Sequence, residues 1–563
     1  MLAFALYLLA GFGYALYFDL NLLEAVLVGG AVFCIYRGFT PKFPVTRAWR
    51  IFSRLAHRRK TAVTLVFFSA LAIRAALLPL LPVPHPVVTD EFSQLLLADT
   101  LAHGRLSNPT HPLWMHFESI HIIQKPTYNS DYFPGTAAIL ALGVLAGHPW
   151  IAVWVLCAAM CAAICWMLQA WLPPPWALLG ALLAVLRFDI ASYWVNSYYG
   201  GCLAALGGAL VLGSYPRLIS KPKLPTALLL GLGTVAIVCT RPFEGLAVVI
   251  PVAVALGYNL IQGRLRFWTL IPIAGVVLAG AACLMLYCRA VTGDPLRAPY
   301  AVNQQTYGWP MTLPWFHPRE IAFDNVELRR YYDYERQVHD RSSTILGELK
   351  FSTLKLQETW RFYFGPALSI PLVMLPLVWR SRRIRLLLIC GGLTILASLV
   401  ETGSSPHYSA AATGCFLAAV AECTRRLPRA QRPQLMLAVP LIMLAILAMR
   451  IGLDKANLPF TQAVNFESWC CVQPGKPDKA RILAMLEKAG GRHLVIVKPK
   501  DNKDDFFQWI YNGADIDQAP VVWARDIGLT QDRALLEHFR DRKVWQLDPN
   551  AQPPRLTPFS GVE

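Results

Sequence analysis

Long apolar stretches separated by short polar segments run along most of the chain. Thr61–Leu81, Ile151–Leu172 and Phe267–Leu286 approach or exceed the roughly 20 apolar residues that a helix needs to cross a hydrocarbon core. The pattern predicts a polytopic α-helical membrane protein with about thirteen transmembrane helices. The expected spans are 1–18, 22–36, 61–81, 150–171, 175–189, 192–213, 224–240, 244–262, 267–288, 366–380, 384–401, 406–424 and 434–452.

The apolar segment Phe133–Gly147 is short and contains interior glycines. If it crossed the membrane, the basic segment RLISKPK would lie outside, whereas without it every later basic cluster lies inside. Because Lys and Arg concentrate in cytoplasmic loops, we expect a re-entrant or interfacial helix here. The clusters are Arg217/Lys221/Lys223, Arg264/Arg266, Arg380/Arg382/Arg383/Arg385 and Arg425/Arg426/Arg429/Arg432.

Charge in the loops predicts the orientation of the chain. Between Arg37 and Lys60 lie eight Lys or Arg and no acid, which places that segment and the N-terminus in the cytoplasm. The following loop is acidic and faces out. We expect residues 1–60 to form an N-terminal helical hairpin with a basic cytoplasmic segment. Residues 61–452 would form the transmembrane core with external loops 82–149 and 290–365, and residues 453–563 a small extracytoplasmic α/β domain.

Composition excludes two classes of protein. Hydrophobic residues make up 55% of the chain and charged residues only 15%, well below a soluble protein of this length. The net charge of +17 could suggest a nucleic-acid partner, but the basic residues lie between apolar segments, so none is expected. Of the 13 cysteines only Cys470 and Cys471 lie in the polar tail, where they could pair or remain free thiols. The chain shows no CxxC pair and no metal-ligand spacing.

The first outer loop opens with Asp90 and Glu91. The sequence EFSQLLLADTL predicts a helix along the membrane surface that Thr89 could cap. The dipole of this helix favours ionised carboxylates at its N-terminal end. Such a carboxylate can act as a general base toward an acceptor hydroxyl or amine, or orient it. A solvated helix start is an equally weighted alternative.

Three further outer motifs carry polar chemistry. In HIIQKPTYNSDYFPG, Lys125 could bind a phosphate, or could be an interfacial lysine. In TRPFEG, a charge pair lies between two close spans, where charge is expensive unless it is paired or functional. SPHY lies at the outer end of another predicted span, where a lone histidine is more often structural. Because the motifs share one predicted face, we expect them to form one site. The residues of interest are Lys125, Tyr128, Tyr132, Arg241, Glu244, His407 and Tyr408.

The loop at 290–365 is rich in Trp, Tyr, Asn, Gln and Pro, which suits either a sugar-binding cover or an interfacial cap. The tail reads as helix, strand, strand, helix and strand, in DKARILAMLEKAG, GRHLVIVKP, APVVWARDIG, DRALLEHFRDRK and VWQLDP. This order predicts a small domain with a parallel sheet.

The DE in the first outer loop, the KP before the next apolar segment and the number of expected spans together resemble the GT-C superfamily of glycosyltransferases. The closest branch is that of the bacterial protein-mannosyltransferases and aminoarabinose transferases, over roughly Thr61–Tyr408. The resemblance implies an inverting glycosyltransferase of the bacterial cytoplasmic membrane, acting on the extracytoplasmic face. Its donor would be a polyprenyl-phosphate-linked sugar and its acceptor an unidentified envelope component.

By the same resemblance, Asp90 is the expected base with Glu91 as its partner, and Lys125 contacts the lipid phosphate. We add Arg241 and His407 as phosphate ligands, because the donor is anionic. The remaining expected substrate-binding residues are Tyr128, Tyr132, Glu244 and Tyr408. Some relatives carry a further aspartate where this chain has Tyr and Gly in RFDIASYWVNSYYGGCLAALGG. Neither a second catalytic acid nor a divalent metal site is therefore supported.

Two other functions are open at this point. A transporter or flippase of a lipid-linked glycan would need charged residues along a path through the inner half of the membrane, and the sequence offers chiefly Glu24 and Asp189. A non-catalytic assembly protein would use the membrane core only to present the tail domain.

Overall fold

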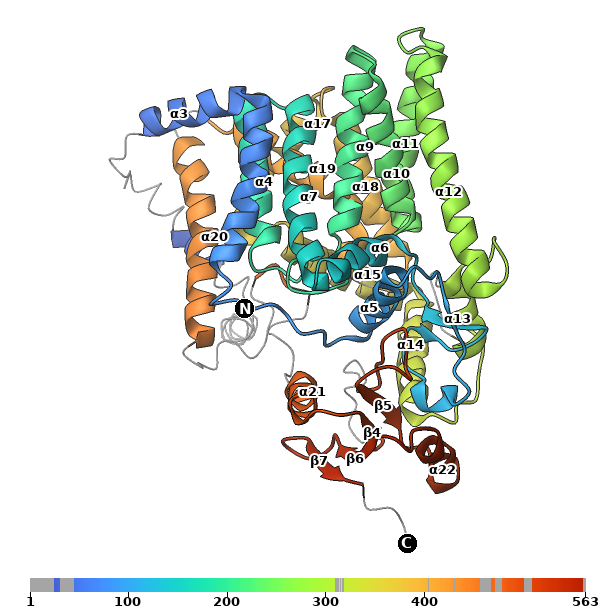
Figure 1. The fold of residues 1–563 in the computed structure, drawn as a ribbon. Coiled ribbons are helices and arrows are strands. Elements are labelled where there is room, and N and C mark those ends of the chain that lie inside the picture. The colour runs from blue at the N-terminus through green and yellow to red at the C-terminus, as the bar shows by residue number, and fades with distance from the viewer. Residues whose placement is uncertain are drawn as a thin grey trace.

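The computed structural model describes residues 25–30, 45–308, 313, 315, 318–403, 405–428, 432–455, 467–470, 478–500 and 509–559. The expected spans 1–18 and 22–36 therefore lie wholly or mostly outside the described residues. Upright helices stand side by side in a bundle (Figure 1). They are α4 (Arg59–Ala76), α7 (Pro149–Trp171), α8 (Pro174–Ala184), α9 (Cys202–Ser220), α10 (Leu224–Val238), α11 (Pro242–Ile261), α12 (Leu270–Thr292), α18 (Arg385–Val400), α19 (Thr413–Arg426) and α20 (Arg432–Lys455).

Helices that could cross a membrane are fewer than the sequence predicts. Within the described ranges, four helices are long and apolar enough, or five if one bent pair forms a single span. The bent pair joins α15 (Ile345–Tyr363) at 91° to the segment Gly365–Trp379, which contains α16 (Gly365–Ser369), η4 (Ile370–Met374) and α17 (Leu375–Trp379). The chain is thus a mostly helical protein with membrane-length apolar helices, and the number of about thirteen spans stays a prediction.

One expected span begins later than predicted. The sequence suggested a helix over 192–213, but α9 begins at Cys202, and residues 190–201 form turns. The preceding helix α8 ends at Ala184 and continues as the π-helical turn η2 (Val185–Asp189). Turn formers in NSYYGG explain the difference, and the turns they form become part of the site described below.

A layer of further helices lies across one end of the bundle, which we call the site end. It contains α5 (Thr89–Ala102), α6 (Gly135–Leu145), α13 (Pro299–Tyr307), α14 (Val326–Ser342) and α15, together with η1 (Trp114–Phe117) and a small sheet of β1 (Asn108–Pro109), β2 (Ile122–Ile123) and β3 (Thr127–Ser130). With 11 residues, α6 spans about 16 Å, roughly half of a hydrocarbon core. It packs on α5 and α7, and its position at a membrane interface stays a prediction.

The opposite end of the bundle carries the basic loops. Helix α9 ends there and α10 begins there, as do the end of α11, the 3-10 turn η3 (Phe267–Thr269) and the start of α12 (Figure 1). Helix α3 (Val45–His57) lies at this same end. The clusters around Arg217 and Arg264 therefore lie at the end opposite α5 and α6.

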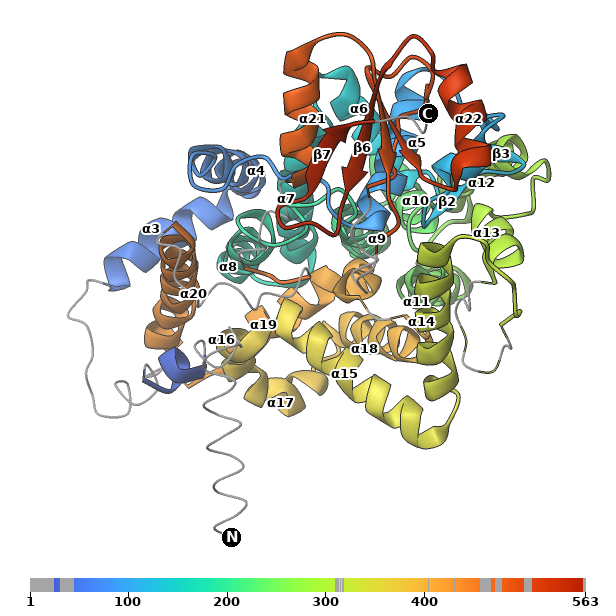
Figure 2. The same ribbon diagram turned by 90° about the horizontal axis from the view of Figure 1, so that it is seen from below.

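The tail forms the small α/β domain that the sequence predicts. Strands β4 (His493–Val497), β5 (Val521–Arg525) and β6 (Lys543–Asp548) are parallel, in the order β5-β4-β6. Helices α21 (Asp478–Ala489) and α22 (Leu529–His538) accompany them. A fourth strand, β7 (Arg555–Pro558), pairs antiparallel with β6 and was not predicted. Figure 2 shows the sheet lying over α5 and α6.

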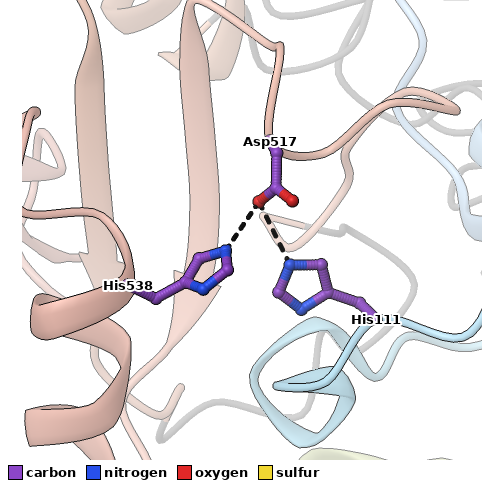
Figure 3. A group of neighbouring side chains, drawn as sticks. All are labelled: His111, Asp517 and His538. Carbon is purple, nitrogen blue, oxygen red and sulfur yellow. Dashed lines mark hydrogen bonds and ion pairs between the residues drawn. The ribbon is translucent and has the colours of Figure 1, made fainter.

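Polar contacts fasten the tail domain to the loop that follows α5. Arg105 donates two hydrogen bonds to the carboxylate of Asp515, each at 3.0 Å. Figure 3 shows His111 of the loop and His538 of α22 both pointing at Asp517, with Nε2–Oδ1 distances of 3.2 and 2.9 Å. The tail domain is therefore positioned directly against the segment that contains α5.

A close approach at Gly208 sets the position of η5 (Pro406–Ala412) against α9. A Cβ atom at residue 208 would lie 1.9 Å from the carbonyl oxygen of Ala411. We expect Gly208→Ala to force α9 and η5 apart and to destabilise the fold by about 1–3 kcal/mol. Thermal melting in detergent checks this, with Gly257→Ala on α11 as the control, because a Cβ there has nothing within 4 Å. Equal melting temperatures would contradict the expectation.

Candidate active site

A cavity opens at the site end of the bundle, with about 470 Å³ of empty space that includes open solvent. Its wall comes from α5, the start of α6, the turn before α9, the start of α11, α13 and η5. Four residues singled out from the sequence line it: Asp90, Tyr132, Arg241 and His407. Its other lining residues are Gln94, Phe133, Thr136, Tyr199, Gly200, Gly201, Ala204, Thr240 and Tyr300.

Asp90 is the carboxylate of the cavity. It lies in the first turn of α5. The hydroxyl of Tyr132 donates to Oδ1 at 2.6 Å, and the hydroxyl of Thr89 donates to Oδ2 at 3.3 Å. These two donors fix the plane of the carboxylate and leave it on the cavity wall. A carboxylate held in this way can accept a proton from a bound hydroxyl or amine.

Glu91 is next to Asp90 in the chain but does not line the cavity. Its side chain is buried and accepts from the backbone N–H groups of Val87 and Val88 at 2.7 and 3.0 Å, and from that of Tyr198 at 3.2 Å. Burial raises the pKa of Glu91 to about 7. The sequence suggested that Glu91 is a catalytic partner of Asp90. In the structure, Glu91 instead caps the N-terminus of α5 and joins it by a hydrogen bond to the turn before α9.

Arg241 supplies the positive charge of the cavity. It precedes α11, and its guanidinium lies over the ring of Tyr408 at 4.1 Å from the centroid. It donates through Nη2 to Nε2 of His407. Because a guanidinium can only donate, Nε2 must present its lone pair and Nδ1 must carry the proton. Nδ1 lies 3.1 Å from the hydroxyl oxygen of Tyr193. His407 is thus a neutral acceptor that orients Arg241.

Two acids lie behind Arg241. Glu244, in the first turn of α11, and Glu401, directly after α18, are hydrogen-bonded to each other and both interact electrostatically with the guanidinium. Glu244 is buried and does not line the cavity. It therefore balances the charge of Arg241, and the structure gives it no direct access to a ligand in the cavity.

Two other predicted site residues lie elsewhere. Lys125 is exposed, and its Nζ lies 4.2 Å from the centroid of the Trp114 ring, away from the cavity lining. Tyr128 is buried, and its hydroxyl donates to the backbone oxygen of Asn512 at 2.9 Å, so that it helps to seat the tail domain. The structure thus separates these two residues from Asp90, Arg241 and His407.

Several residues of the site were missed by the sequence reasoning. Tyr199 and Tyr300 add two aromatic side chains to the cavity, and Gln94 adds an amide one turn after Asp90. Aromatic faces beside amide and carboxylate groups suit a sugar ring. The spacing of Gln94 from Asp90, at i and i+4 of one helix, was a usable signal. Tyr199 lay hidden in the segment that the hydropathy pattern assigned to a span.

One group of possible metal ligands occurs in the described part of the chain: His111, Asp517 and His538, whose ligand atoms lie within 4.8 Å of one another. The N–H of Leu113 donates to Nδ1 of His111 at 3.0 Å. Nδ1 therefore presents its lone pair, and Nε2 carries the proton that it donates to Asp517. A protonated Nε2 cannot bind a metal. These three residues form a hydrogen-bonded contact between the tail domain and the loop after α5, and none of them lines the cavity.

No protein-family model matches the chain, and no curated protein matches it. Among solved structures, it is similar to ArnT from Cupriavidus metallidurans bound to undecaprenyl phosphate, with 11% identity and a TM-score of 0.43, over 87% of this chain and 92% of that one. The apo form of that protein gives 13% identity and a TM-score of 0.46, over 86% and 92%.

The chain is also similar to the Archaeoglobus fulgidus oligosaccharyltransferase tethered to an acceptor peptide, with 11% identity and a TM-score of 0.39, over 77% of this chain. It spans only 62% of that protein's length. These likenesses concern the fold alone, which is GT-C-like.

Proposed function

We propose that this protein is a membrane glycosyltransferase that moves a sugar from a polyprenyl-phosphate donor to an acceptor at the site end of the bundle. The observation that carries the proposal is a single cavity with a carboxylate, Asp90, and a guanidinium, Arg241, on its wall. The first suits deprotonation of an acceptor, and the second suits an anionic phosphate. The aromatic side chains of Tyr132, Tyr199 and Tyr300 line the same space.

The reaction assigns one role to each group. The acceptor O–H or N–H gives its proton to Asp90, and the freed electron pair forms the bond to the anomeric carbon of the sugar. The bond from that carbon to the phosphate oxygen breaks, and polyprenyl phosphate leaves with one additional negative charge. Arg241 stabilises the developing charge, so its interaction with the phosphate strengthens as the reaction proceeds.

The position of the cavity suits a lipid-linked substrate. It opens at the end of apolar helices, where an isoprenoid chain can remain beside the bundle while its phosphate reaches Arg241. The basic loops lie at the opposite end. By the preference of Lys and Arg for cytoplasmic loops, the site end faces the extracytoplasmic side.

A transfer assay tests the proposal. The intact protein in detergent is supplied with a radiolabelled polyprenyl-phosphate sugar and a bacterial envelope extract as acceptor, and labelled product and released polyprenyl phosphate are measured. We expect both to appear together. Binding of the donor without transfer would instead favour a carrier or a scaffold, and the absence of both binding and transfer would overturn the proposal.

A further inference from the structure

A short segment beyond the last bundle helix reaches the candidate site. Residues 467–470 are described after α20, and the backbone oxygen of Ser468 accepts from the N–H of Tyr193 at 3.0 Å. Trp469 is buried, with the guanidinium of Arg187 at 4.1 Å from its ring centroid. Cys470 is fully buried and disulfide-bonded. The segment is therefore anchored in the bundle at three consecutive residues.

Glu467, the first residue of this segment, faces the turn that carries His407. Its Oε1 lies 3.6 Å from Nδ1 of His407, and its carboxyl is hydrogen-bonded to Ser405, the residue that precedes η5. The side chain is only 16% exposed. Since Nε2 of His407 accepts from Arg241, Nδ1 carries the proton and presents it toward Tyr193 and Glu467.

We propose that Glu467 is a positioning residue of the site: it holds the His407 ring in the tautomer and orientation that keep the Arg241 guanidinium on the cavity wall. The inference rests on the proposed function, because Arg241 is taken to bind the donor phosphate. Glu467 itself does not line the cavity. It acts through two contacts with the turn 405–407, and it makes the segment after α20 a part of the phosphate site.

The surroundings of Glu467 give this role a pH signature. Burial raises the pKa of Glu467 to about 8, so the carboxyl is largely protonated at neutral pH and becomes charged as the pH rises. An oxygen of either form can accept a hydrogen bond from the Nδ1–H of His407, but the ionised form adds a negative charge beside the phosphate site. The titratable and charged groups that face it are Asp90 on α5, Arg241 before α11, Glu358 on α15, His407 on η5 and the phenols of Tyr193, Tyr199 and Tyr363.

Binding of polyprenyl phosphate to the full-length protein in detergent tests the inference. We expect Glu467→Ala to weaken binding about tenfold at pH 7, the effect of losing a contact that holds a charged hydrogen-bond donor in place. Glu467→Gln keeps an acceptor and remains neutral, so it should bind within about twofold of wild type at pH 7. Glu487→Gln removes an exposed acid on α21 and serves as the matched control.

The pH profile separates positioning from a merely structural role. Between pH 7 and 9 the affinity of the wild-type protein should fall as Glu467 ionises, whereas Glu467→Gln should show a flat profile. The phosphate group does not confuse the comparison, because its second ionisation, with a pKa of about 6, is nearly complete at pH 7. If Glu467→Ala does not fold, the pH dependence of donor affinity in Glu467→Gln still tests the role of Glu467.

The two proposals fail in different ways. Wild-type affinity in Glu467→Ala, or parallel pH profiles for the wild type and Glu467→Gln, would overturn the role of Glu467. The proposed function would still stand if Arg241→Gln binds polyprenyl phosphate weakly. Wild-type affinity in Arg241→Gln would instead remove the phosphate site itself, and with it the basis of the proposed function.

Discussion

Asp90→Asn is expected to lower the rate of sugar transfer about a thousandfold while leaving the affinity for the polyprenyl-phosphate donor nearly unchanged. The amide has the shape of the carboxylate and can still accept from the hydroxyl of Tyr132, so the cavity should keep its form. It cannot take a proton from the acceptor, and the reaction loses its base. A large loss in kcat without a change in donor binding distinguishes this from a misfolded site.

The matched control is Asp340→Asn. Asp340 is on α14 with a side chain 70% exposed, so the same chemical change there should not affect transfer. Donor binding, melting temperature and single-turnover transfer are measured for both variants. Transfer at the wild-type rate by Asp90→Asn would show that another group deprotonates the acceptor. Loss of binding together with transfer would show that Asp90 shapes the donor site instead.

The adjacent pair Asp90–Glu91 shows what a sequence can and cannot tell about such a site. Successive residues of a helix point about 100° apart, so the two carboxylates point in different directions, and only one of them lines the cavity. Which one depends on the angle at which α5 lies on the bundle, and packing of α5 against α6 and the tail domain sets that angle. The sequence therefore pointed to the acidic pair as part of the site, but it could not tell that Asp90 lines the cavity and Glu91 does not.

Lys125 illustrates a limit of short motifs. The KP pair lies in the segment between α5 and α6, and the path of a segment with few regular elements cannot be read from local sequence. In the structure the ammonium group lies against the ring of Trp114. Arg241 and His407 were predictable for a different reason: each is directly attached to an apolar segment, so the end of the bundle at which they lie follows from counting segments.

The elements of the fold were likewise predictable only where the local sequence carries a clear pattern. The tail strands β4, β5 and β6 were predicted because short apolar runs alternate there with polar helices. The turns at 190–201 were not, because Trp, Tyr and Val make them as apolar as a membrane span. Glu467 was missed since nothing in its own sequence surroundings relates it to η5. Such contacts between distant segments arise only from tertiary packing.

Arg241→Gln is expected to weaken binding of polyprenyl phosphate about 10- to 100-fold and to slow transfer further. Glutamine keeps a donor for His407 but loses the charge that the phosphate needs. Arg241→Lys should restore only part of the affinity, because an ammonium is a point charge without the planar fork of the guanidinium. Arg266→Gln, which removes an exposed cation before η3, is the control for the general effect of the protein's net charge on an anionic lipid.

A second variant is needed to separate a loss of stability, caused by the acids behind Arg241, from a loss of phosphate binding. Without the guanidinium, Glu244 and Glu401 lose the cation that both interact with, although Lys355 stays near Glu401, and an uncompensated buried charge destabilises a protein by about 3–5 kcal/mol. The double variant Arg241→Gln/Glu244→Gln removes one charge of each sign and should recover much of the melting temperature. If the double variant melts like the wild type but still binds donor weakly, the loss belongs to phosphate recognition. If it melts and binds like the wild type, the guanidinium only neutralises Glu244, and the donor phosphate is held elsewhere.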